Sequence, residues 1–183
     1  STHLLAEVIR QGLSGEKSLL LSLFDPPAVQ ACISAGVGST ITLKVGARTD
    51  RLHGDPIEVT GNVRAITDGK FEEPKPTHGG LRFFDYGPSV ALDTGDGHTI
   101  LLHTVRGLGN MSREQYYSIG ILPEQYRVII CKGTVSPRAA YEPISREIIM
   151  ANSAGVTSAN MSSFSYQNRR IPLYPFELET KFD

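Results

Sequence analysis

Residues 19–27 read Leu-Leu-Leu-Ser-Leu-Phe-Asp-Pro-Pro, a short apolar run followed at once by a signal that starts a helix. The run Leu19–Phe24 has the length and composition of a buried strand. Asp25 can accept hydrogen bonds from the free amides of a helix N-terminus, and Pro26 suits the first helical position. The stretch therefore predicts a buried strand that passes directly into a helix, which we expect to end at Ala35, before a glycine.

A second helix is expected before this stretch. Leu4, Leu5, Val8 and Ile9 recur at helical spacing, with Ser1 or Thr2 available as a cap and Gly12 placed to end the helix.

After the stretch, from Ser39 to Leu102, apolar residues alternate with polar ones, which is typical of strands with one buried face. The segment Lys70–Gly80 lacks this period, and its prolines and glycines predict an exposed loop. The segments Ser89–Asp93 and Thr99–His103 flank Thr-Gly-Asp-Gly-His, a pattern typical of a hairpin.

Helix and strand signals alternate again in the last third of the chain. A capping box at Ser112–Gln115 predicts a short helix, and Arg127–Cys131 is expected to be a buried strand. Ser136 and Pro137 offer a cap and first turn for a further helix, and Ile148–Met150 is expected to be the last strand.

These patterns predict a mixed α/β (α+β) fold. We expect a largely antiparallel central sheet with helices packed on it, and alternating helices and strands at both ends. The domain is expected to span residues 1–176, followed by a charged tail at 177–183. The chain from Ser153 on is polar and lacks a period, and we expect it to wrap over the surface or meet a partner.

Charge and hydropathy exclude several classes of partner. The chain has 18 basic and 19 acidic residues, a formal net charge of −1, and no basic stripe that could neutralise phosphates. No apolar run approaches the roughly 20 residues of a membrane-spanning helix. The sequence therefore predicts neither nucleic acid nor membrane as a partner.

The two cysteines, Cys32 and Cys131, both lie in apolar surroundings. Buried free thiols explain them better than a disulfide, because free cysteine behaves as a small hydrophobic residue. A reducing, cytoplasmic setting is expected. Cys131 lies beside a lysine but closes an apolar strand, so a core role is favoured over a catalytic one.

The five histidines do not have the spacing of a metal site. They are His3, His53, His78, His98 and His103. No His-Glu-x-x-His helix is present, and the last two would point to opposite faces of one strand. A Gly-x-Ser-x-Gly nucleophile elbow is also absent. We therefore expect no catalytic residue and no metal ligand in this chain.

The strongest candidate for ligand binding is the turn from Lys132 to Arg138. A strand that ends in a lysine and a turn that opens a helix could gather Lys132, Arg138 and the Ser136 hydroxyl around a carboxylate or other anion. Arg106 could join such a site. Ordinary capping and solvated cations would explain the same residues.

An ordered set of segments resembles the C-terminal domain of the microcystinase C (MlrC) family of metallopeptidase-like proteins. The set includes Asp25-Pro-Pro-Ala-Val29, Ala35-Gly-Val-Gly38, Ile66-Thr-Asp-Gly-Lys-Phe71, Ile119-Gly-Ile-Leu-Pro123, Arg138-Ala-Ala-Tyr-Glu-Pro-Ile144 and Gly155-Val-Thr-Ser158.

This resemblance implies a two-domain hydrolase that acts on short or linearised peptides. A larger N-terminal domain would hold zinc through histidine and acidic ligands, none of which maps onto this chain. The resemblance also implies microcystin degradation, but family members often have a His-Phe pair where this sequence has Ser136-Pro137, a departure that leaves microcystin itself in question as the substrate.

Three functions follow as hypotheses. In the first, the domain helps to form the substrate cleft of a metal-dependent hydrolase, with the N-terminal catalytic domain as its partner. In the second, it is a non-enzymatic module for homodimerisation or regulation. In the third, it is a small enzyme in itself, which would require tight zinc binding by the isolated chain.

Overall fold

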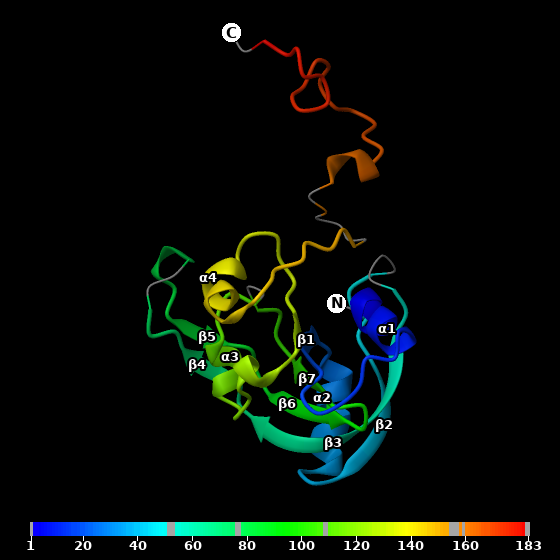
Figure 1. Ribbon diagram of the computed structural model, residues 1–183, viewed down its shortest axis with the longest axis vertical. Coiled ribbons are helices and arrows are strands. Elements are labelled where there is room, and N and C mark those ends of the chain that lie inside the picture. Colours follow the sequence, from blue (N-terminus) through cyan, green and yellow to red (C-terminus); the bar gives the residue numbers. More distant parts are fainter. Residues whose placement is uncertain are drawn as a thin grey trace.

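A computed structural model describes residues 2–50, 54–75, 78–107, 110–153, 158 and 160–181 (Figure 1). Three positions used in the sequence analysis, Ser1, His53 and the segment 155–157, lie outside these residues.

The strands are β1 Leu19–Phe24, β2 Thr40–Val45, β3 Ile57–Thr67, β4 Lys70–Glu72, β5 Phe83–Asp85, β6 Ser89–Thr94, β7 His98–His103 and β8 Val128–Ile130. The α-helices are α1 Thr2–Arg10, α2 Pro26–Ala35, α3 Glu114–Tyr117 and α4 Arg138–Tyr141, and short 3-10 helices lie at His78–Gly80, Pro123–Gln125, Glu142–Ile144 and Met161–Ser163.

Six strands form one mixed sheet in the order β2-β3-β6-β7-β1-β8. The pairs β2–β3, β3–β6 and β6–β7 are antiparallel, whereas β1 runs parallel to both of its neighbours, β7 and β8. The expected mixed α/β fold is confirmed. The sheet is mostly antiparallel, as expected, but it also contains two parallel pairs, because the first strand inserts between two strands that come much later in the chain.

The strand β1 shows how the sequence produces two cores. Leu19, Leu21 and Leu23 pack on one face of the sheet with side chains from α1 and α2, while Leu20 packs on the other face with Tyr116 from α3. Successive side chains of a strand point to opposite faces, so an apolar residue at nearly every position fits a strand covered on both sides. The strand and helix predicted for residues 19–35 are confirmed.

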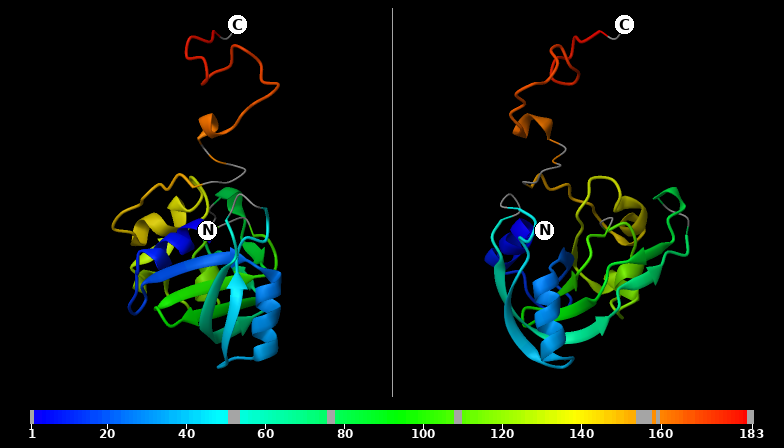
Figure 2. Two further views of the ribbon diagram at one scale, coloured as in Figure 1. Left: turned by 90° about the vertical axis from the view of Figure 1, so that its right-hand side faces the viewer. Right: turned by 180° about the vertical axis from the view of Figure 1, so that it is seen from behind.

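The outer part of the sheet curls. β2 and the start of β3 bend around α2, which lies inside the curve (Figures 1 and 2). Both strands alternate between more and less exposed residues, as predicted. In contrast, all six residues of β7 are buried, because helices cover both faces of the sheet at its centre.

Three local predictions were wrong. The segment Lys70–Gly80 was expected to be a loop, but it begins with β4, which pairs with β5 and stacks Phe71 on Phe84. β8 is an edge strand whose three residues are partly exposed, not buried. Ile148–Met150 forms no strand and is exposed.

No helix among the described residues has the length and apolar character needed to cross a bilayer.

Candidate functional site

The three parallel strands all have their C-terminal ends on the same side of the sheet. We call this side the carboxyl edge; it is distinct from the outermost strands of the sheet, β2 and β8. β7 ends at His103, β1 at Phe24 and β8 at Ile130, in the lateral order β7-β1-β8. Arg106 follows β7 and Lys132 follows β8 by a few residues, so both cations lie at this edge. Ligands of open α/β sheets bind beyond the carboxyl ends of the strands, which makes this edge the candidate site.

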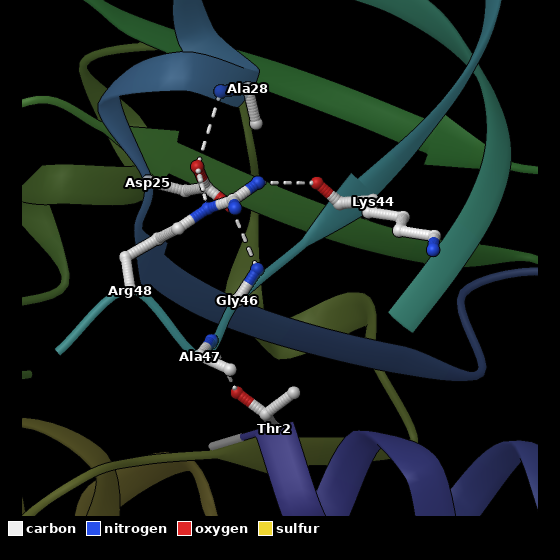
Figure 3. A network of polar contacts seen from close by, with 7 residues as sticks. All are labelled: Thr2, Asp25, Ala28, Lys44, Gly46, Ala47 and Arg48. Carbon is white, nitrogen blue, oxygen red and sulfur yellow. Dashed lines mark hydrogen bonds and ion pairs between the residues drawn. The ribbon is translucent and has the colours of Figure 1, made fainter. Parts of the chain in front are cut away.

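Asp25 fixes the loops at the centre of the carboxyl edge (Figure 3). Its side chain is fully buried, and its carboxylate accepts hydrogen bonds from the amide of Ala28 at 3.1 Å and the amide of Gly46 at 2.7 Å. The Arg48 Nε donates to the same carboxylate at 2.9 Å, and the guanidinium also donates to the Lys44 carbonyl. The predicted helix cap is confirmed, and the same carboxylate also anchors the end of β2 and the loop after it.

Arg106 is held at the edge by two contacts and still faces solvent. Its guanidinium lies 5.1 Å from the centroid of the Phe24 ring and donates to the Thr49 hydroxyl at 3.1 Å. Such a cation–π contact orients a guanidinium without neutralising its charge. The guanidinium of Arg106 is therefore oriented at the surface, and neither of these two contacts neutralises its charge.

A series of aromatic rings continues from Phe24 along the edge. His103 follows it with a ring-centroid separation of 6.3 Å, then Tyr86 at 5.3 Å, Phe71 at 5.1 Å and Phe84 at 4.9 Å. The sequence analysis missed this series, because the predicted loop Lys70–Gly80 includes β4 and no strand was predicted at β5. The available signal for β4 was the alternation of polar and apolar residues at 70–72, which read lysine, phenylalanine and glutamate.

The turn from Lys132 to Arg138 is compact and exposed. Gly133 has a φ of 143°, and a side chain there would start 2.8 Å from the Ser136 hydroxyl, so the bend requires glycine. Ser136 does not cap α4, which begins after Pro137 with no side-chain cap. Arg138 forms an exposed ion pair with Glu142 at 3.5 Å.

The structure thus places the four predicted residues in two groups. Lys132, Ser136 and Arg138 share one turn, whereas the contacts described for Arg106 go to Thr49 and Phe24.

A buried polar cluster beside the edge was also missed. Asn110 accepts hydrogen bonds from the Ser22 hydroxyl at 2.8 Å and the Gln115 amide at 2.9 Å, and Gln115 also donates to the Tyr141 hydroxyl at 3.1 Å. Gln115 therefore joins α3 to α4 and does not complete the predicted capping box, although Ser112 does accept from the amide of Glu114. The cluster ties the helices of this face to β1.

Comparison with known proteins identifies the family. The family profile described as MlrC C-terminus matches residues 1–168. The chain belongs to this family. Microcystinase C of a Sphingomonas species is 25% identical to this MlrC C-terminal domain over 156 residues, covering 85% of this chain and 28% of that protein.

A solved structure of a metallopeptidase-like protein from a Mesorhizobium species shares the fold, with a TM-score of 0.77 and 20% sequence identity. The match covers 100% of the MlrC C-terminal domain and 35% of that chain. The domain thus spans about a third of the length of these relatives and corresponds to a C-terminal part of larger proteins.

The described residues of this MlrC C-terminal domain do not fit a metal ion, because no group of three histidine, cysteine or acidic side chains is placed to hold one. His98 and His103 point to opposite faces of β7, as expected from their spacing: the first contacts the Ser18 hydroxyl and the second the Val105 carbonyl.

Both cysteines are free thiols, as predicted. Burial raises the pKa of the Cys131 thiol to about 12, so it stays protonated and unreactive at neutral pH. This agrees with the core role expected for Cys131.

The buried histidines predict a loss of stability in acid. Burial lowers the pKa of both His98 and His103 below the ordinary value of 6.5, so each is neutral in the folded protein. The unfolded chain takes up these protons first as the pH falls. Their contribution to stability is therefore complete above pH 6.5 and is lost as the pH falls through the lowered pKa values.

Urea unfolding at about pH 7.5 and about pH 5 measures this effect. The His98→Asn variant keeps a donor for Ser18 but cannot titrate, so its stability should change less between the two pH values than that of the wild type. An equal change in both proteins would contradict the assignment to His98.

Proposed function

We propose that this MlrC C-terminal domain helps to form the substrate cleft of a metal-dependent, peptidase-like hydrolase. The metal, zinc by the family resemblance, would be bound by a preceding catalytic domain. The observation that carries this proposal is the carboxyl edge, where exposed cations and an aromatic series lie together.

The chemistry of the edge fits a short or linearised peptide. A guanidinium or ammonium group pairs with a carboxylate of such a substrate, and Arg106 and Lys132 are the candidates at the strand ends. Arg138 and the Ser136 hydroxyl, from the turn that carries Lys132, could add to the same anion site. Phe24 and Phe71, the two partly exposed rings of the aromatic series, would pack against apolar side chains of the peptide.

In this proposal the domain supplies binding and no reacting group. Binding energy from parts of a substrate remote from the scissile bond holds that bond in place, which contributes to the rate without any catalytic residue here.

Charge reversal at the carboxyl edge tests the proposal. We expect Arg106→Glu, Lys132→Glu or Arg138→Glu, each made in the longer protein, to lower kcat/KM for a peptide with a free carboxylate. A charge-assisted hydrogen bond contributes enough to binding for a decrease of about 10- to 100-fold at a residue that contacts the substrate. Steady-state kinetics provide the measurement.

Arg127→Glu is the matched control. Arg127 is also exposed, but it precedes β8 and so lies at the opposite edge of the sheet from Lys132. Unchanged kinetics in all three edge variants would rule out the anion site. A loss in the control of the same size would assign the effect to net charge.

A second candidate function is a non-enzymatic one, homodimerisation or regulation. Exposed apolar side chains near the C-terminus, such as Ile149 and Leu178, favour it. Sedimentation of the 183-residue chain tests this function, since a monomer at all concentrations would count against it. The cytoplasmic setting stays a prediction.

A further inference from the structure

The C-terminal segment is described at residues 145–153, 158 and 160–181, and its last part, residues 160–181, extends away from the packed body (Figures 1 and 2). The backbone hydrogen bonds described within it are local, for example from Phe164 to Met161 and from Glu177 to Leu173. The described part of the segment thus folds on itself and does not add to the sheet.

Large apolar side chains are concentrated in this segment. Of the eighteen large hydrophobic residues exposed among the described ones, nine fall between positions 148 and 178. They are Ile148, Ile149, Met150, Met161, Tyr166, Ile171, Leu173, Tyr174 and Leu178. Chains that remain solvated as linkers are poor in such residues, because exposing them to water is unfavourable. The composition therefore indicates a surface that is covered by a partner.

Local contacts also give the segment a shape of its own. Arg169 binds the Glu177 carboxylate through two nitrogens, at 2.8 and 2.6 Å, and lies 4.5 Å from the centroid of the Phe176 ring. The Tyr166 ring packs against the same ring at 5.3 Å. A segment that is ordered before binding loses less entropy when it docks.

The position of the segment indicates what covers it. The N-terminal end of α1 lies on the side of the body from which the segment departs, in all three views of Figures 1 and 2. In the longer relatives, the part that precedes this domain must join it at that end. These relatives are about three times as long as the match, and the alignment with the solved structure includes the segment.

We propose that the nine exposed apolar side chains between Ile148 and Leu178 dock on the domain that precedes this one in the longer protein and are buried against it. The partner of the segment is therefore an apolar surface of that preceding domain. This inference rests on the proposed function only in requiring a preceding domain.

Amide hydrogen exchange of the segment tests the inference, measured in the protein encoded by the complete reading frame and in the 183-residue chain. We expect the amides between Ile171 and Leu178 to exchange about 100-fold more slowly in the longer protein, because docking suppresses local opening. Equal, fast exchange in both proteins would overturn the proposal. Slow exchange in the 183-residue chain, with protection that increases with protein concentration, would also overturn it, because the partner would then be a second copy of the chain.

A double variant, Ile171→Ser with Leu178→Ser, links the protection to these side chains. We expect it to restore fast exchange in the longer protein, whereas Val37→Ser, at an exposed apolar position in the body, should not. Retained protection in the double variant would show that these side chains do not dock.

The two proposals fail separately. If the cleft hypothesis is wrong, the charge-reversal variants will have unchanged kinetics while the segment remains protected from exchange. If the docking hypothesis is wrong, the amides of the segment will exchange fast in the longer protein, whatever the kinetics of the variants.

Discussion

Replacing Asp25 by alanine is expected to lower the free energy of unfolding by about 3–5 kcal/mol, the range for removing one partner of a buried ion pair. The fully buried carboxylate caps α2 through Ala28, holds the amide of Gly46 and pairs with Arg48. Alanine removes all three contacts and leaves the arginine without its buried partner. Urea or thermal unfolding of the variant measures the loss.

Asp68→Ala is a suitable control for this experiment. Asp68 also accepts a hydrogen bond from a nearby backbone amide, that of Lys70 at 3.0 Å, but it does so at the surface. We expect its loss to cost less than about 1 kcal/mol, as is usual for exposed positions. If the two variants lost equal stability, the contacts of Asp25 with α2, Gly46 and Arg48 would not have the stabilising role assigned to them.

Replacing Gly97 by alanine is expected to cost about 3 kcal/mol, at the upper end of the usual range for single substitutions. Gly97 has a φ of 80°, which favours glycine, and a side chain there would start 1.9 Å from the carbonyl oxygen of Gly15. Relief of that overlap would displace the loop before β1, which is hydrogen-bonded to the β6–β7 turn through Gly15 and Ser18. Chemical unfolding measures the cost.

The same turn provides the control. Gly95 lacks the positive φ, and a side chain there would meet nothing within 4 Å. We expect Gly95→Ala to change the free energy of unfolding by less than about 0.5 kcal/mol. Similar costs at the two glycines would show that the overlap at Gly97 is relieved without strain.

Local signals in the sequence were sufficient to predict β1, α2 and the Asp25 cap, because each depends on residues that are close together in the chain. The parallel pairing of β1 with β7 and β8 was not predicted, since hydrogen bonds between distant segments leave no local pattern. The exposure of β8 follows from that pairing, because a strand at the edge of the sheet has a neighbour on one side only.

The candidate site stays a prediction, and only part of its geometry could be predicted from the sequence, for the same reason. Lys132 and Arg106 were chosen from their types and their places after strands, and the topology puts both at one edge of the sheet. The contacts that hold Arg106, to Phe24 and Thr49, come from segments far from it in sequence. The predicted Ser136 cap failed because the chain bends at Gly133 and α4 starts only after Pro137.

The place of β1 between β7 and β8 also has a consequence for how the protein reaches its native state. The segment Leu19–Phe24 leaves the ribosome well before β7 and β8, its hydrogen-bonding partners, which come much later in the chain. Pairing of such distant segments slows folding, because a long loop must close before any contact compensates for the lost entropy. During that interval a six-residue apolar strand is exposed on both edges, which is the kind of segment that aggregates. Chaperone binding during synthesis is therefore expected to centre on the stretch that determines the fold.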